Sequence, residues 1–309
     1  MKAPRTVAIS TSSFASHSTE PLDKLRAAGF QARLNPQGRR LTANEAQDHI
    51  RDAVGLLAGT EPLSRDVLTS VSNLRVISRV GAGVDNVDRA AARELGIEVK
   101  STPEAHIDAV AELTVAGLLA ALRRIPEADR RVREGWAKPA GRLLRGKTVG
   151  IVGLGRVGRA VATLLGPFGA KLLATDTNED FAAAEWLGVH YLDFDELLAK
   201  SDVVTLHLNH SQATHHLVGA RELARMKHDA ALVNTSRGGL IDEAALAAHL
   251  REHPEALAYI DCFEEEPYTG PLIELENAVL TPHVGTYARE CRVRMELEAV
   301  DNLLSALAP

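Results

Sequence analysis

A glycine-rich segment in the middle of the chain has the residue types and spacing that hold a dinucleotide. Gly153, Gly155 and Gly158 form a GxGxxG pattern between an apolar run and a stretch of helical periodicity, and Asp176 follows the next apolar run. The glycines allow a tight turn, a close approach of the backbone to a pyrophosphate and close packing of the helix. Because the N-terminus of the helix presents free N–H groups, the segment predicts a dinucleotide site.

The acid after the glycines also indicates which dinucleotide binds. A carboxylate at Asp176 accepts hydrogen bonds from a ribose 2′-hydroxyl and would repel a 2′-phosphate, and Thr177 and Asn178 add no cation beside it. We therefore expect NAD rather than NADP. A structural turn without a ligand is the competing interpretation, and the strand, the helix and the acid at their expected distances argue against it.

Three further segments with chemically active side chains follow predicted strands in the same half of the chain. They are residues 233–239 (VNTSRGG), 261–267 (DCFEEEP) and 281–285 (TPHVG). Ligands of open α/β sheets bind beyond the carboxyl ends of the strands, so these segments place one arginine, one acid and one histidine near a nicotinamide. Each segment alone could be a surface ion pair, a solvated loop or a capped turn, but their joint order favours an active site.

The elements that must position these residues alternate along the whole chain. Five short apolar runs predict strands near residues 7–10, 31–34, 54–57, 76–78 and 97–99. Six more are expected near residues 148–152, 171–175, 203–208, 231–234, 258–262 and 278–280. Helical periodicity between them indicates parallel sheets covered by helices. The predicted fold class is α/β, with two doubly wound parallel-sheet domains: a Rossmann dinucleotide-binding domain and a flavodoxin-like substrate domain.

The length of 309 residues also favours two domains over one core. We place the dinucleotide-binding domain at residues 102–284 and the substrate domain at residues 1–101 and 285–309. The stretch 109–123 is apolar almost all round, so it should be buried between domains or at a subunit contact. An amphipathic helix at 286–307 is expected to cross back to the first domain, and residues 135–146 have the composition of an arm or a linker.

Composition and charge exclude several classes of protein. The apolar share of 45% and the charged share of 25% are typical of soluble globular proteins, and a net charge of −6 disfavours nucleic acid as a partner. The two cysteines, Cys262 and Cys291, cannot form a disulfide framework, which fits a reducing cytoplasm. The apolar stretch near the N-terminus is too short for a signal peptide, so we expect neither secretion nor a membrane span.

Motifs along essentially the whole chain resemble those of the D-isomer-specific 2-hydroxyacid dehydrogenases. They are GTEP at 59–62, RVGAGVDNVD at 79–88, AELT at 111–114 and GKT at 146–148, together with the three segments above. The resemblance is closest to the 3-phosphoglycerate dehydrogenase-like branch. It implies an NAD-dependent oxidoreductase acting on CH–OH donors, which transfers a hydride between C2 of a small D-2-hydroxy acid and NAD.

The same resemblance assigns catalytic roles to Arg237, Glu266 and His283. His283 accepts the hydroxyl proton, because an imidazole titrates near neutrality. Glu266 holds the imidazole in one tautomer and raises its pKa, while Arg237 binds the substrate carboxylate and the reacting oxygen. The two preceding glutamates are alternatives to Glu266, and the family spacing before Pro267 selects Glu266.

Further site residues are implied by the resemblance. The cofactor residues are Gly153, Gly155, Arg156, Val157, Gly158, Asp176, His207, Thr235, Asp261 and Gly285. The substrate residues are Arg79, Val80, Gly81, Ala82, His106 and Arg237. Asp261 is expected to contact the nicotinamide amide, with a strand-end cap as its alternative. The turn at 80–84 is expected to bind the substrate carboxylate through its N–H groups, with a plain tight turn as its alternative.

The chain departs from this branch in four respects. The branch usually has an asparagine where this chain has His106, and a proline where it has Asn209. Phosphoglycerate enzymes tend to carry a basic residue near Ala58, so only Arg79 and Lys138 remain as partners for a phosphate. The C-terminal regulatory domains of some phosphoglycerate dehydrogenases are missing from the sequence, so we expect no serine feedback through such a domain. Whether the substrate is phosphorylated stays open.

Four histidines lie close together in the sequence: His207, His210, His215 and His216. Their spacing fits no zinc pattern, and no cysteine or paired carboxylate completes a tetrahedral set, so we expect no metal site.

Several alternatives accompany the predicted function. A glyoxylate or hydroxypyruvate reductase of the same family is one, and a non-enzymatic NAD-sensing scaffold similar to the related corepressors is another. Formate dehydrogenases resemble the family but pair the histidine with glutamine, so Glu266 argues against that activity. The resemblance also implies a homodimer formed through the 109–146 region, with no nucleic acid and no membrane as partner.

Overall fold

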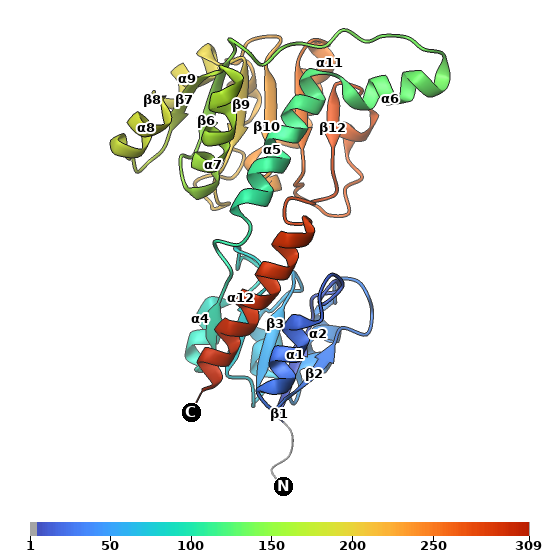
Figure 1. Cartoon of the computed structure of the whole chain (residues 1–309), viewed down its shortest axis with the longest axis vertical. Coiled ribbons are helices and arrows are strands. Elements are labelled where there is room, and N and C mark those ends of the chain that lie inside the picture. Colours follow the sequence, from blue (N-terminus) through green and yellow to red (C-terminus); the bar gives the residue numbers. More distant parts are fainter. Residues whose placement is uncertain (1–4, 309) are drawn as a thin grey trace. The chain divides into compact units, whose positions relative to one another are not determined.

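Two parallel sheets organise the chain, and each belongs to its own structural unit. The computed structural model describes residues 5–308 and divides the chain into unit 1, Met1–His106 with Tyr287–Pro309, and unit 2, Ile107–Thr286 (Figure 1). The division falls five and two residues after the predicted boundaries, because the chain leaves unit 1 where a long helix begins at Ile107. Among the described residues, no helix is long and apolar enough to cross a membrane.

Unit 1 contains a five-stranded sheet with the strand order β2-β1-β3-β4-β5. Its strands are β1 (Arg5–Ile9), β2 (Phe30–Leu34), β3 (Gly55–Ala58), β4 (Val76–Arg79) and β5 (Glu98–Lys100). Its helices are α1 (Glu20–Ala27), α2 (Ala43–Ile50), α3 (Arg65–Thr69), α4 (Arg89–Glu94) and α12 (Arg289–Leu307). The central strands are apolar and buried on both faces, as expected for a parallel sheet covered by helices.

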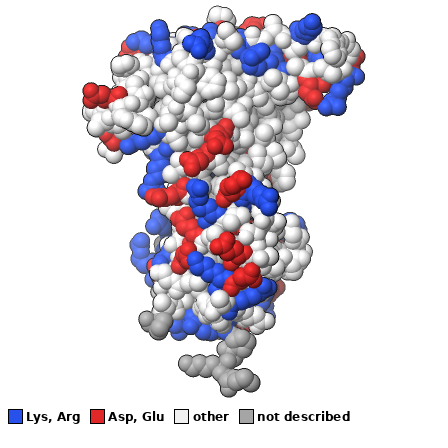
Figure 2. Space-filling model, viewed as in Figure 1, with Lys and Arg blue, Asp and Glu red and all other residues white. Residues whose placement is uncertain are grey.

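The C-terminal helix α12 returns to unit 1, as the amphipathic pattern predicts. It packs against α1 and against strands β3 to β5, with Met295, Val300 and Leu303 buried. A Cβ on Gly55 would lie 3.0 Å from the Leu303 side chain, so this glycine in β3 lets the helix approach the sheet closely. Figure 2 shows acidic and basic side chains interspersed over the exposed side of α12, the polar face of the amphipathic pattern.

Unit 2 contains a seven-stranded sheet with the order β12-β11-β10-β9-β6-β7-β8. Its strands are β6 (Thr148–Val152), β7 (Lys171–Thr175), β8 (Val189–Tyr191), β9 (Val203–Leu206), β10 (Ala231–Asn234), β11 (Leu257–Ile260) and β12 (Ala278–Leu280). Its helices are α5 (Ile107–Leu122), α6 (Ile125–Glu134), α7 (Arg156–Leu165), α8 (Phe181–Leu187), α9 (Phe194–Lys200), α10 (Ala220–Leu223) and α11 (Glu243–Glu252). The chain runs outward from β6 in both directions, and such a switch point is where open α/β sheets bind ligands.

The stretch 109–123, which is apolar almost all round in the sequence, lies almost entirely in helix α5. It packs inside unit 2 against α7 and strands β10 to β12, with Leu118 and Leu122 buried. A Cβ on Gly117 would overlap the ring of Tyr259, which is itself buried. Burial within unit 2 therefore accounts for most of the apolar surface of this helix.

Three elements of unit 2 escape the sequence pattern. Strand β8 has three residues, too few for a recognisable alternation, so the second sheet has seven strands instead of six. Helix α6 has no buried residue and is stabilised by pairs such as Arg131 with Glu127 and Arg133 with Asp129, which leave no apolar periodicity. Helix α9 is short, although its N-cap Asp193 is a local signal that could have revealed it.

Candidate active site

The glycine-rich turn between β6 and α7 is built for a close approach of backbone to backbone. Gly153 has φ 95°, and a Cβ there would lie 2.6 Å from the carbonyl oxygen of His207. A Cβ on Gly158 would overlap the carbonyl oxygen of Gly153, so α7 can begin this close to the turn only with glycine. Gly155 has no atom within 4 Å of its Cβ position, which leaves room for a ligand against this part of the turn.

The start of helix α7 has the properties of a phosphate site. Its N-cap is Gly155, no side chain caps the first turn, and no acid lies in that turn. The first turn of the helix, from Arg156 and Val157 onward, therefore directs N–H groups and the positive end of the helix dipole toward an anion site. The donor set fits the pyrophosphate of a dinucleotide.

Asp176, after β7, completes this arrangement and also stabilises the turn. One carboxylate oxygen accepts a hydrogen bond from the N–H of Leu154 at 2.8 Å, and the other accepts from the N–H of Asn178 at 2.9 Å. Each oxygen keeps a second lone pair for a ribose hydroxyl. The acid therefore positions the glycine turn in addition to its predicted contact with the ribose.

His207 and Thr235 follow directly after β9 and β10. The Nε2 atom of His207 is 3.0 Å from the hydroxyl of Thr205, and burial lowers the pKa of His207 to about 3, so its ring is neutral. The Thr235 hydroxyl lies 2.7 Å from that of Thr114 in α5 and is buried. The predicted cofactor contacts of both residues remain predictions.

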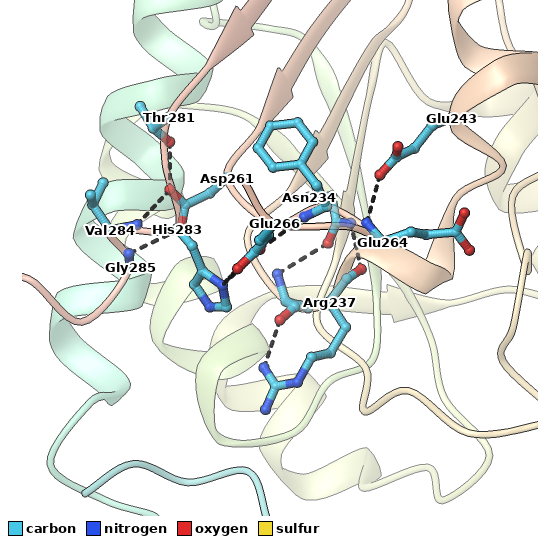
Figure 3. A network of polar contacts seen from close by, with 12 residues as sticks. Asn234, Arg237, Glu243, Asp261, Glu264, Glu266, Thr281, His283, Val284 and Gly285 are labelled. Carbon is cyan, nitrogen blue, oxygen red and sulfur yellow. Dashed lines mark hydrogen bonds and ion pairs between the residues drawn. The ribbon is translucent and has the colours of Figure 1, made fainter. Parts of the chain in front are cut away.

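Arg237 lies on the segment between β10 and a short 3₁₀ helix, Gly238–Leu240. Its guanidinium donates to the Ser236 carbonyl at 2.6 Å, and its own carbonyl accepts from the Asn234 side chain at 2.7 Å (Figure 3). A Cβ on Gly238 would overlap the backbone of Phe263, so the segment packs directly against the loop after β11. This packing brings the arginine segment and the acidic segment together.

His283 and Glu266 form a direct pair (Figure 3). The Nδ1 atom of the histidine is 2.9 Å and 3.0 Å from the two carboxylate oxygens of Glu266. A carboxylate only accepts, so Nδ1 carries the proton and Nε2 is left for a reacting group. A hydrogen bond with the Cys262 thiol, followed by the pairing with Glu266, raises the pKa of His283 to about 10. Burial raises the pKa of Cys262 as well.

The buried Asp261 shapes the turn that carries this histidine. Its carboxylate accepts hydrogen bonds from the N–H groups of Val284 and Gly285, both at 2.9 Å, and from the Thr281 hydroxyl. His283 has the left-handed backbone conformation, φ 53°, and its N–H donates to the Asp261 carbonyl at 2.8 Å. Such a conformation persists only where surrounding contacts fix it.

Asp261 therefore caps the histidine turn, which is the strand-end role that the sequence offers as the alternative to a nicotinamide contact. Its side chain is fully buried, and both oxygens already accept hydrogen bonds. The expected contact with a nicotinamide amide remains a prediction. A signal was present in the sequence: an acid at the end of a strand commonly caps the neighbouring backbone.

The three consecutive glutamates after β11 have different partners. Glu264 lies 2.7 Å from the imidazole of His216, while Glu266 faces His283. Glu265 is exposed. The structure thus distinguishes the glutamates that sequence spacing alone had to choose between, and it pairs the predicted one with the predicted histidine.

The predicted substrate turn belongs to unit 1 and follows β4. The N–H of Gly81 donates to the Thr102 hydroxyl and to the Arg79 carbonyl, both at 2.9 Å, and the N–H of Val80 donates to the Ala58 carbonyl at 2.9 Å. These two amides are thus already used within unit 1, and any carboxylate site must rely on the amides from Ala82 onward. Substrate binding at this turn stays a prediction.

Ala58 and His106 are the other two unit 1 positions that the sequence singles out. Ala58 ends β3 and is completely buried. His106 is the last residue of unit 1, immediately before α5.

Comparisons with known proteins agree with this geometry. A sequence model described as "D-isomer specific 2-hydroxyacid dehydrogenase, NAD binding domain" matches residues 115–285. The chain is 41% identical to a glyoxylate reductase of Korarchaeum cryptofilum over 257 residues, covering 80% of this chain and 77% of that protein. It is 36% identical to a D-3-phosphoglycerate dehydrogenase of Archaeoglobus fulgidus over 298 residues, covering 93% of this chain but 55% of that protein. A crystal structure of a Thermus thermophilus protein superposes with a TM-score of 0.90 at 37% identity, covering 98% of this chain and 96% of that one.

Proposed function

The chain belongs to the D-isomer-specific 2-hydroxyacid dehydrogenase family and is an NAD-dependent oxidoreductase, and we propose that it reduces a small, unphosphorylated 2-keto acid such as glyoxylate or hydroxypyruvate. The observation that carries this proposal is the His283–Glu266 pair, in which the pKa of the histidine is raised to about 10. An imidazole with this pKa is protonated at neutral pH and is therefore prepared to donate a proton.

The protein residues have separate tasks in this reaction. NADH, when bound, supplies the hydride that reduces the keto carbon. His283 donates its Nε2 proton to the keto oxygen, which becomes the hydroxyl of the product. Glu266 keeps the proton of Nδ1 in place and stabilises the imidazolium before transfer. Arg237 binds the carboxylate of the keto acid with its planar guanidinium and polarises the carbonyl.

The end of β3 supports an unphosphorylated substrate. Ala58 stands where a basic residue would meet a phosphate, and it is completely buried, so it offers neither charge nor donor. The similarity to glyoxylate reductases, which covers more than three quarters of the Korarchaeum protein, supports the same assignment.

A phosphorylated substrate, 3-phosphohydroxypyruvate, is the second candidate. It is favoured by the similarity to D-3-phosphoglycerate dehydrogenase over 93% of this chain. The chain spans about half the length of such relatives, at 55% and 49% of two of them. The predicted phosphate partners for this candidate are Arg79 and Lys138.

We also propose a homodimer formed by part of the 109–146 region. Within this region α5 is buried in unit 2, whereas α6 and the segment after it expose Ile125, Val132, Trp136 and Leu143 by 54%, 58%, 69% and 67%. Contiguous exposed apolar side chains mark interaction surfaces. Light scattering should give the mass of a dimer for the parent chain and of a monomer for Trp136→Lys with Leu143→Lys. A monomeric parent chain would contradict the proposal.

A substrate panel tests the function. NADH consumption should be fastest with glyoxylate or hydroxypyruvate, slower with 3-phosphohydroxypyruvate and much slower with NADPH in place of NADH. The opposite order of the phosphorylated and unphosphorylated keto acids would favour the second candidate. If NADH binds but no 2-keto acid is turned over, the NAD-sensing scaffold becomes the better explanation.

A further inference from the structure

Four side chains outside the active site converge on the surface of unit 2. His210, His215 and His216 lie in the loop between β9 and α10, and Glu264 lies in the loop after β11, 48 residues after His216. Potential ligand atoms of His215, His216 and Glu264 all lie within 4.8 Å of one another. The Nε2 atom of His210 is 3.3 Å from Nδ1 of His215. The carboxylate that the histidine segment lacks in the sequence is therefore supplied by the fold.

The backbone holds the imidazoles on one side of the loop. His216 has the left-handed conformation, φ 49°, and its ring stacks on that of His215 with a centroid distance of 3.9 Å. Adjacent side chains in regular helices and strands diverge, so this conformation is what lets neighbouring rings stack. The N–H of His216 donates to the Gly239 carbonyl at 2.8 Å, and a Cβ on Gly239 would lie 2.7 Å from the His210 ring. The backbone at Gly239 therefore contacts both His216 and His210.

Negative charge gathers beside these imidazoles. The N–H of Glu264 donates to the carboxylate of Glu243 at 2.8 Å (Figure 3).

We propose that His210, His215, His216 and Glu264 form a site for one Zn²⁺ ion. Zinc takes nitrogen and carboxylate ligands at roughly 2.0–2.2 Å in tetrahedral geometry, which sets neighbouring ligand atoms about 3.3 Å apart. The separations here are 3.3 Å between His210 and His215, 3.9 Å between His215 and Glu264, and 2.7 Å between His216 and Glu264. These three separations bracket the required value.

A hydrogen-bonded histidine–glutamate pair alone would not require this arrangement. One imidazole is enough to pair with Glu264, yet two more ring nitrogens lie next to that pair. Imidazole nitrogens are the preferred protein ligands of zinc, copper and nickel. The side chains of His215, His216 and Glu264 are 51%, 37% and 36% exposed, so an ion reaches them from solvent without a change of fold.

Cobalt titration of the metal-free protein tests the site. Co²⁺ replaces Zn²⁺ in tetrahedral sites and makes them visible by absorption. The parent chain should bind one Co²⁺ tightly with the spectrum of a four-coordinate complex, and Zn²⁺ should displace it. His215→Ala and Glu264→Gln should each weaken binding at least tenfold, with circular dichroism unchanged because the side chains are at the surface.

Two further variants make the result specific. His253→Ala removes one ring of another close histidine pair, His249 and His253, whose ring centroids are 4.6 Å apart, and it should leave the tight site intact. His283→Ala should also leave it intact. If His283→Ala abolishes binding while His215→Ala does not, the ion belongs to the active site and the proposal is wrong. Equal binding by the parent chain and Glu264→Gln would overturn it as well.

Discussion

Each unit has a glycine-rich turn after a strand of its parallel sheet, and the side chains around the two turns differ. After β6, no atom lies near the Cβ position of Gly155, and Asp176 ties the turn to the end of β7. After β4, the guanidinium of Arg79 lies over Gly81, where a Cβ would be 2.5 Å from Nη1, and Thr102 accepts the N–H of Gly81. Similar strand-and-turn geometry therefore acquires its function from the side chains around the turn.

We assign cofactor binding and proton transfer to unit 2, and substrate selection to unit 1. The largest effect should follow from removing the proton donor of unit 2. His283→Ala should lower kcat about 10²–10⁴-fold, because general acid catalysis contributes this much, while NADH binding stays unchanged. Stopped-flow fluorescence measures both quantities. An active variant would place the proton donor elsewhere and break the division between the units.

A matched pair of glycine substitutions compares the turns directly. Gly158→Ala forces a Cβ onto the Gly153 carbonyl, so it should weaken NADH binding more than tenfold and destabilise the protein by roughly 1–3 kcal/mol. Gly81→Ala meets the flexible end of Arg79 and a strained φ of 150°. It should raise KM for the keto acid and leave the Kd of NADH unchanged, as measured by titration of NADH fluorescence. Equal effects of both variants on NADH would contradict the assignment.

The acid beside the cofactor turn should set the preference between the two dinucleotides. Asp176→Ala removes a charged acceptor worth roughly 1.5–3 kcal/mol, so the Kd for NADH should rise about tenfold or more. The affinity for NADPH should stay the same or increase. Asp180→Asn is the matched control: it alters an acid that pairs with Arg159 nearby and should change neither affinity. A loss of NADPH binding equal to that of NADH would show that Asp176 acts only by stabilising the turn.

The smallest effect concerns the pH dependence of the proton donor. Reduction requires protonated His283. The value of kcat/KM should therefore be constant from neutral pH up to the raised pKa of His283, and it should fall as the pH passes through that pKa. Cys262→Val removes the leading contact that raises this pKa, so the fall should begin at lower pH, with little change at pH 7. Cys291→Val, at a buried cysteine of unit 1, should not move the profile. An unchanged profile in Cys262→Val would leave Glu266 as the main cause of the shift.

Much of the fold follows from local patterns in the chain. Strands such as Thr148–Val152 and Lys171–Thr175 have the bounds that their apolar runs predict, because a buried parallel strand needs an unbroken apolar segment. The same logic misses β8 and α6, whose stability comes from neighbouring strands or surface ion pairs instead of apolar periodicity. The residue types of the site are also local: glycines, an acid at the right distance, and an arginine, a glutamate and a histidine after successive strands.

The sequence therefore determined the family of the fold, the cofactor and the residue types that act, since these depend on periodicity and on short motifs. Contacts between residues far apart in the chain were decided by the fold. Asp261 fixes the backbone around His283, Phe263 packs on Gly238, and Glu264 meets His216. Such contacts depend on how the strands are ordered in the sheet and where their loops meet, and no local pattern encodes that order. The two glycine-rich turns show the same division, because similar glycine patterns are surrounded by different side chains, Asp176 in one unit and Arg79 in the other.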